Sequence, residues 1–228
     1  MRLSGAVAAL VSLAFAASAC ANSLVYHRAI GAAPLSDAVA AARVHISQWE
    51  PRPDNTRANH TTPTAAQLRS FHQHSDMPYQ AYVTGNYTGT TDEILQWGAA
   101  KWGFSPRLFR AVASVETWWH QAFIGDGGSS FGLMQVRVPY HCCLPFIQTS
   151  TAFNVDYYGA ILRAYYDGKQ TFLEDVEHGR NYRAGDLWGS VGVWASGRWH
   201  MGTSDSYVQA VKQRVADRIW RTADFANG

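Results

Sequence analysis

The sequence predicts a mainly α-helical domain over residues 90–228, preceded by an export signal and a flexible arm. First, several segments after residue 90 carry apolar residues at helical spacing, with capping residues at their ends. Second, no segment shows the strict alternation of apolar and polar residues that is typical of a strand. Third, 228 residues with 47% apolar content are enough for one domain with a sizeable core plus appendages.

The helical segments have recognisable start and stop signals. Residues 90–103 begin with Thr-Thr-Asp, a cap-like start, and end at a glycine. Ser105 is placed as the N-cap of the next helix, with Pro106 at its first position. The spacing of apolar residues also predicts helices over residues 151–168 and 204–220.

Residues 1–19 have the pattern of a signal peptide. Arg2 supplies a short positive region, residues 5–16 are apolar, and an Ala-Ser-Ala cleavage signal ends at Ala19. The next residue completes an Ala-Ser-Ala-Cys sequence that resembles a lipobox, in which Cys20 is lipidated after cleavage. Ordinary cleavage at the neighbouring alanines explains the same residues, so both interpretations stay open. We expect an exported protein. It lies in the cell envelope, in the periplasm or at the outer face of the membrane, with or without a lipid anchor on Cys20, or it is secreted.

Residues 20–89 are predicted to form a mostly flexible linker. One amphipathic helix is expected within it, over residues 35–49. The following stretch is polar and turn-rich, with Pro51, Pro53 and a Gly/Thr-rich run over residues 84–91.

Charge and composition narrow the classes of partner. Nineteen Lys and Arg against 17 Asp and Glu give a net charge of +2 without a basic block, which gives no case for nucleic acid. No HExxH, P-loop or CxxC pattern is present, so no metal or organic cofactor is implied, and we expect a monomer. The adjacent pair Cys142-Cys143 can form only a strained ring within one chain, or stay as two thiols.

One acid lies on an apolar helical face. Glu116 follows Phe109 by seven residues and Val112 by four, offsets that place it on the apolar stripe of a helix. Apolar surroundings raise the pKa of a carboxyl because they disfavour its charged form, so this acid can hold a proton at neutral pH. A helix-end glutamate that faces solvent or pairs with an arginine is the alternative.

The run from Ser114 to Arg137 resembles the SLT-type lytic transglycosylases and the related goose-type lysozymes. In that superfamily a catalytic Glu ends a helix, and a Gly-rich turn leads to Gly-Leu-Met-Gln, which residues 132–135 match in full. Thr117 stands where the family usually has Ser, and it keeps the hydroxyl. Phe153-Asn154-Val155 resembles the family's segment after that loop, so the resemblance covers about residues 92–215.

The resemblance implies a lysozyme-like helical domain with a groove for the glycan strands of peptidoglycan. It implies that Glu116 is the single acid and base of a lytic transglycosylase. Glu116 protonates the glycosidic oxygen between N-acetylmuramic acid and N-acetylglucosamine, then accepts the C6 hydroxyl proton, which leaves a 1,6-anhydro end. That intramolecular attack needs no second carboxylate to position water.

The resemblance also implies substrate-binding positions in the Gly-Leu-Met-Gln region. Gln135 is expected to hydrogen-bond the sugar or organise Glu116, or else to fix the loop as a structural amide. Gly132 is expected to let the backbone approach the glycan, with Met134 at the same surface. Ser130 either contacts sugar hydroxyls or serves the turn.

Four positions bear on the outcome of the reaction. Trp194 and Ala195 occupy the place of the family's Tyr-Asn-Ala-Gly motif, so Trp194 can stack on a sugar but the Asn hydrogen bond is missing. Asp126 matches an acid of the hydrolytic goose-type members, or caps the Gly turn. Arg137 stands where those members have another acid, which favours the transglycosylase.

Two alternative functions stay open. The first is a goose-type muramidase that hydrolyses the same bond. The second is a non-catalytic glycan-binding or envelope-assembly protein on the same fold. The retained Glu116 and Gln135 favour an enzyme, whereas Ala195 favours the binding protein.

Overall fold

The computed structural model describes residues 24–26, 29–74, 77–138 and 140–228. The predicted signal peptide and Cys20 lie outside these residues. The protein is mainly helical, with 54% helix and a small three-stranded sheet. Among the described residues, no helix is long and apolar enough to cross a membrane.

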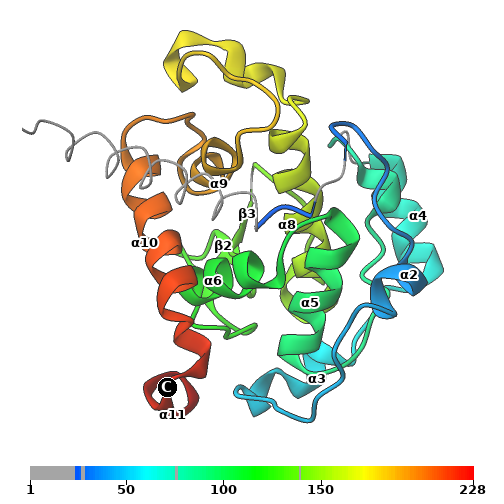
Figure 1. The fold of residues 1–228 in the computed structure, drawn as a ribbon. Helices are drawn as coiled ribbons and strands as arrows, with labels where there is room; N and C mark the ends of the chain where they lie inside the picture. The colour runs from blue at the N-terminus through cyan, green and yellow to red at the C-terminus, as the bar shows by residue number, and fades with distance from the viewer. Residues whose placement is uncertain (1–23, 27–28, 75–76, 139) are drawn as a thin grey trace, which may run out of the picture.

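Five helices build the core, with α8 at its centre (Figure 1). They are α5 (Thr91–Trp102), α6 (Pro106–Glu116), α8 (Thr151–Tyr166), α9 (Leu187–Ser196) and α10 (Thr203–Asp217). Every residue of α5 is buried, and so is every residue of α8 except Tyr166. Helix α5 packs against α8 and α6, while α10 packs against α9 and α6. The end of α6 is therefore enclosed by α10.

The predicted starts of α5 and α6 are confirmed by their caps. Thr90 and Glu93 form a capping box in which each side chain bonds the other residue's backbone N–H. Gly103 ends α5 in the left-handed conformation, with φ of 81°. The Ser105 side chain accepts a backbone N–H at the start of α6, and Pro106 is its first residue.

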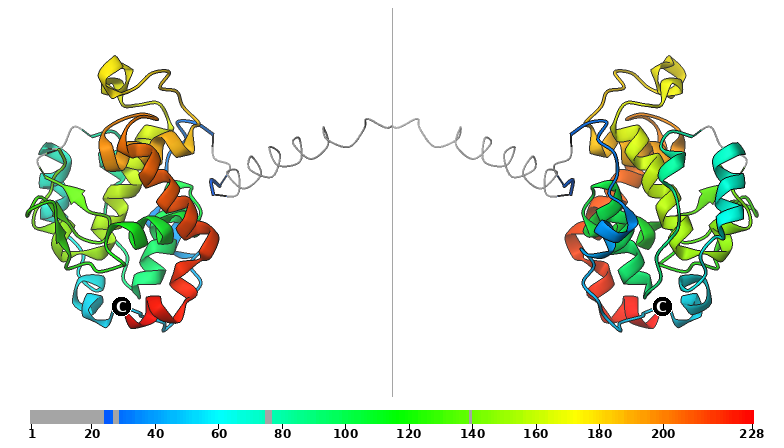
Figure 2. Two further views of the ribbon diagram at one scale, coloured as in Figure 1. Left: turned by 90° about the vertical axis from the view of Figure 1, so that its left-hand side faces the viewer. Right: turned by 90° about the vertical axis from the view of Figure 1, so that its right-hand side faces the viewer.

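The later helices also match the prediction, with one earlier end. The helix expected over residues 151–168 is α8. The helix expected over residues 204–220 is α10, which ends at Asp217 because Arg218 has a left-handed φ of 49°. The connecting and terminal pieces are α7 (Phe146–Thr149), η3 (Thr171–Glu174), η4 (Val176–His178), η5 (Ile219–Arg221) and α11 (Ala223–Asn227). The segment between α8 and α9 projects from one end of the molecule (Figure 2).

A small antiparallel sheet follows α6, where no strand was predicted. Its strands are β1 (Ile124–Gly125), β2 (Ser130–Phe131) and β3 (Val136–Arg137), in the order β1-β2-β3. Gly125 pairs with Ser130, and Phe131 pairs with Val136. Strands of two residues are too short to show an alternating pattern, so they could not be predicted from periodicity.

The prediction of a flexible linker is wrong for the described residues before 90. They form α2 (Asp37–Ala41), η1 (Pro53–Asn55), α3 (Thr56–Asn59), α4 (Ala65–His74) and η2 (Gln80–Tyr82). The expected helix over residues 35–49 is shortened to α2 alone. Arg52, Asn55, Phe71 and Val83 are all buried against the helical core. In Figures 1 and 2 this segment lies along the core, with α4 on the side away from α10.

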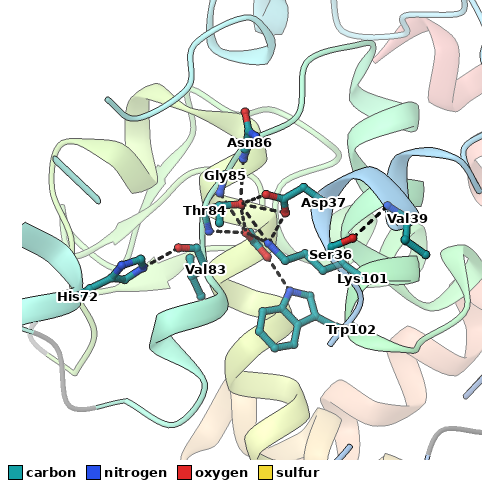
Figure 3. A network of polar contacts seen from close by, with 11 residues as sticks. Ser36, Asp37, Val39, His72, Val83, Thr84, Gly85, Asn86, Lys101 and Trp102 are labelled. Carbon is teal, nitrogen blue, oxygen red and sulfur yellow. Dashed lines mark hydrogen bonds and ion pairs between the residues drawn. The ribbon is translucent and has the colours of Figure 1, made fainter. Parts of the chain in front are cut away.

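A buried ionic network attaches this segment to the core (Figure 3). The Lys101 ammonium lies 2.7 Å from a carboxylate oxygen of Asp37 and 2.7 Å from one of Asp156. Asp156 also accepts the Trp102 indole N–H at 2.7 Å and the backbone N–H of Thr84 at 2.8 Å. Buried charges are tolerated only when they are paired and hydrogen-bonded, and this network meets that condition while it attaches Asp37 and Thr84 to the core.

Candidate active site

Glu116 is the last residue of α6 and lies on its apolar side. Phe109 and Val112 on the same side are completely buried, whereas Glu116 keeps part of its surface open. Helix α6 stops there because Trp118 and Trp119 turn left-handed, with φ of 56° and 70°. The prediction that this acid sits at the edge of the core is confirmed.

Tyr207 of α10 holds the Glu116 side chain. Its hydroxyl donates a hydrogen bond to Glu116 Oε1. This contact follows from the packing of α10 on α6. Tyr207 was not predicted as a site residue, although it lies four residues before the buried Val211 and therefore places a hydroxyl on the apolar side of α10.

The pKa of Glu116 is raised from 4.5 to about 7. Burial is the largest cause, because it disfavours the charged carboxylate. The hydrogen bond from Tyr207 lowers this pKa, the negative charge of Asp126 raises it, and a hydrogen bond from the Trp194 indole lowers it. The group is thus divided between acid and carboxylate at neutral pH, which suits a group that must give and accept a proton.

We expect Glu116→Gln to stabilise the protein at high pH and to have little effect at low pH. Below pH 4.5 the acid is protonated in both the folded and the unfolded chain. Between pH 4.5 and about 7 the unfolded chain ionises first, so the wild-type free energy of unfolding falls, and it stays lowered above pH 7. Urea unfolding should show the variant more stable by about 1–3 kcal/mol at pH 8, with the difference vanishing near pH 4. An equal difference at both pH values would contradict the assigned pKa.

Trp194, His141 and Tyr158 form an aromatic cluster next to Glu116. The Trp194 indole N–H donates to the Met134 carbonyl at 3.1 Å, and its effect on the pKa of Glu116 places it beside that carboxyl. The His141 ring stacks on Trp194 with 5.3 Å between centroids, and Tyr158 meets Trp194 edge-on at 4.9 Å. Burial lowers the pKa of His141 to about 4, so its ring is neutral at neutral pH.

Asp126 and Ser130 are joined within the hairpin. The Ser130 hydroxyl donates to Asp126 Oδ2 at 2.6 Å, and Arg137 Nε lies 3.7 Å from the same oxygen. Asp126 is exposed and left-handed, with φ of 48°. Its role as a turn residue agrees with this geometry, while its charge still reaches Glu116.

Gln135 fixes the loop and makes no hydrogen bond to Glu116. Its side-chain amide donates to the Gly132 carbonyl at 2.9 Å and to the Phe123 carbonyl at 3.3 Å. The predicted role of Gln135 as a structural amide is present, and its predicted contact with the sugar, which is compatible with that role, stays a prediction.

Gly132 and Met134 are both buried, and their predicted contacts with the glycan stay predictions. Gly132 is buried and left-handed, and a Cβ there would collide with the Asn154 amide and the Ile147 carbonyl. The Met134 side chain is completely buried, and its backbone N–H donates to Asn154 Oδ1 at 2.8 Å. The motif therefore packs the loop against α8, and the absence of a Cβ at Gly132 leaves room for the Asn154 amide.

The N-terminal segment holds the loop that follows Glu116. Arg52, only 2% exposed, donates to the Trp118 carbonyl at 2.8 Å and to the Phe225 carbonyl at 2.8 Å. Asn55 donates to the Trp119 carbonyl at 2.7 Å and accepts the Gln121 backbone N–H at 2.8 Å. The two left-handed tryptophans are thus held by residues that the sequence placed in a linker.

The loop is also tied to the hairpin. Thr117 donates its hydroxyl to the Leu133 carbonyl at 3.0 Å, so the hydroxyl retained at this position has a structural partner. The buried Gln121 accepts the Leu133 N–H at 2.9 Å and donates to the Ile147 carbonyl at 3.1 Å. Glu116 is therefore anchored by the loop that leaves it as well as by its helix.

Cys142 and Cys143 are joined by a disulfide next to His141, so of the two predicted states the bonded one is present and neither is a free thiol. Among the described residues, no group of three or more His, Cys, Asp or Glu could hold a metal ion.

No family model matches the chain, and neither the curated proteins nor the solved structures include one that is significantly similar to it.

Proposed function

We propose that the chain is a peptidoglycan lytic transglycosylase in which Glu116 is the single general acid and base. One observation carries this proposal: a partly open carboxyl at the end of an apolar helix, whose pKa burial raises to about 7. An ordinary surface glutamate is ionised at neutral pH and has no proton to give. The resemblance of residues 114–137 to the SLT-type enzymes supplies the substrate class.

The reaction requires two proton transfers through the same carboxyl. Glu116 gives its proton to the glycosidic oxygen as the bond from C1 of N-acetylmuramic acid breaks. The carboxylate then accepts the proton of the C6 hydroxyl of that sugar, whose oxygen bonds to C1 and closes the 1,6-anhydro ring. The Tyr207 hydroxyl favours the carboxylate as it forms, because a hydrogen bond to the charged state lowers its free energy. No water is consumed.

Hydrolysis of the same bond is the second candidate, because Asp126 is close enough for its negative charge to raise the pKa of Glu116. A hydrolase needs a group that activates water, and Asp126 is the acid placed for it. The bonds of Asp126 to Ser130 and Arg137 support a structural role and favour the transglycosylase. The binding-protein alternative rests on Ala195, which is exposed and has no side-chain donor.

The proposed partner is the glycan strand of peptidoglycan, bound by a monomer that needs no metal or organic cofactor. Export to the cell envelope or the medium, by way of residues 1–19 and with or without a lipid on Cys20, is part of the same proposal, because peptidoglycan lies outside the cytoplasm.

The test is mass spectrometry of the soluble products that the full chain releases from purified peptidoglycan. We expect muropeptides with 1,6-anhydro ends, lighter by one water than hydrolysed ones. Reducing ends in their place would establish the muramidase and turn attention to Asp126. No release at any pH, with sacculi still bound, would establish the binding protein.

A further inference from the structure

The hydroxyl of Tyr158 is buried without a hydrogen-bond partner. The side chain is completely buried in α8, and no described residue accepts from or donates to its oxygen. A buried polar group without a partner lowers stability, and phenylalanine would fill the same space without that loss. A buried hydroxyl of this kind is uncommon in folded proteins and indicates a role that phenylalanine could not fill.

Two ring contacts place Tyr158 between Trp194 and helix α6, which ends at Glu116. Its ring meets Trp194 edge-on, with 4.9 Å between centroids, and Trp194 lies beside the Glu116 carboxyl. On its other side it meets Phe109 at 5.2 Å, two turns before Glu116 on the same face of α6. Tyr158 thus lies between the indole and the apolar stripe that ends in the acid.

The electrostatic coupling agrees with this position. After burial, the charge of Glu116 is the largest cause that raises the pKa of Tyr158 well above its ordinary value. The pKa of Tyr207 is raised in turn by Glu116 and by Tyr158. Both phenols therefore keep their protons at neutral pH and are available as donors.

We propose that Tyr158 is a positioning residue whose hydroxyl donates a hydrogen bond to Glu116 when that carboxyl is ionised. Tyr207 occupies one oxygen of the carboxyl, and the carboxylate has further lone pairs to satisfy when it is partly buried. The protonated acid needs this donor less, so the hydroxyl stays without a partner until the proton has left. Tyr158 keeps its own proton throughout, and the proton that moves is that of Glu116. The effect on catalysis rests on the proposed function, whereas the effect on the carboxyl does not.

The decisive experiment titrates Glu116 by carbon-13 NMR in the full chain, with Glu116→Gln used to assign its carboxyl signal. Tyr158→Phe should raise the pKa of Glu116 by about 0.5 to 1 pH unit, because the charged form loses a donor. At pH 5, where Glu116 is protonated and the hydroxyl has no partner, its Tm should equal or exceed that of the wild type. With peptidoglycan, kcat should fall about 10-fold with KM unchanged, because the contact strengthens only as the charge develops.

Thr151→Val is the matched control. The Thr151 hydroxyl is also buried without a partner among the described residues, and it lies in the same helix, seven residues or about 10 Å from Tyr158. This variant should show an equal or higher Tm with an unchanged titration of Glu116.

Two results would overturn the inference. In the first, Tyr158→Phe behaves like Thr151→Val, with an unmoved titration. In the second, Tyr158→Phe lowers Tm without moving the titration, which would mean an ordinary structural bond. Absence of wild-type turnover would count against the proposed function alone, since the titration decides the role of Tyr158 without substrate.

Discussion

Glu116→Gln should abolish the release of soluble muropeptides from peptidoglycan, with a loss of at least about 1000-fold. The amide keeps the volume of the side chain and can still accept the bond from Tyr207, but it has no proton to give and is too weak a base. One group performs both proton transfers in the proposed reaction, so no other residue compensates. The measurement is the rate of product release by mass spectrometry at pH 6 to 7.

Glu174→Gln is the control for that loss. Glu174 lies exposed in η3, within the acidic run between α8 and α9, and the chemical change is the same. Its activity should stay within about twofold of the wild type, as for a surface substitution. Residual turnover of Glu116→Gln within 10-fold of the wild type would reject Glu116 as the catalytic acid.

Asp156→Asn should lower the free energy of unfolding by about 3–5 kcal/mol. Every described hydrogen bond of this carboxylate comes from a donor. The Trp102 indole donates to Oδ1, and the Lys101 ammonium, the Thr84 hydroxyl and two backbone N–H groups donate to Oδ2. An asparagine must turn its own NH₂ toward at least one of these donors, and it leaves the Lys101 charge with less compensation. Urea unfolding monitored by circular dichroism measures the loss.

Asp175→Asn is the comparison for this prediction. Asp175 is exposed between η3 and η4, and its substitution should change the free energy of unfolding by less than about 0.5 kcal/mol. A loss below about 1 kcal/mol for Asp156→Asn would show that the network attaching residues 37–85 contributes little to stability.

The helices that were predicted correctly are those whose signals are local. The capping box of Thr90 with Glu93 and the Ser105-Pro106 start are written within a few residues of the chain, so the sequence alone located α5 and α6. The segment before residue 90 takes its ordered structure from hydrogen bonds to residues that are distant in the sequence. Asn55 is stabilised by Trp119, 64 residues away, and local composition cannot distinguish such an asparagine from one in a linker.

In the candidate site, too, some residues could be predicted from local sequence and others could not. Glu116 could be found because a carboxylate on an apolar helical stripe conflicts with its surroundings. Tyr207 could not be assigned to it, since the pair is separated by 91 residues and a tyrosine suits an amphipathic helix. The motif located Gly132, but its close approach to Asn154 could not be predicted, because Asn154 lies 22 residues further along the chain.

The bond from Arg52 to the carbonyl of Phe225 sets an order on folding. It joins residues that are 173 positions apart in the sequence, so the bond can form only when these two distant segments have come together. Contacts of such long range form slowly, because the loop must close before the bond contributes. We therefore expect the Arg52 guanidinium to stay hydrated while the helical core assembles, and to be enclosed only when residue 225 packs against it. We expect this contact, and with it the final form of the loop after Glu116, to form late in folding.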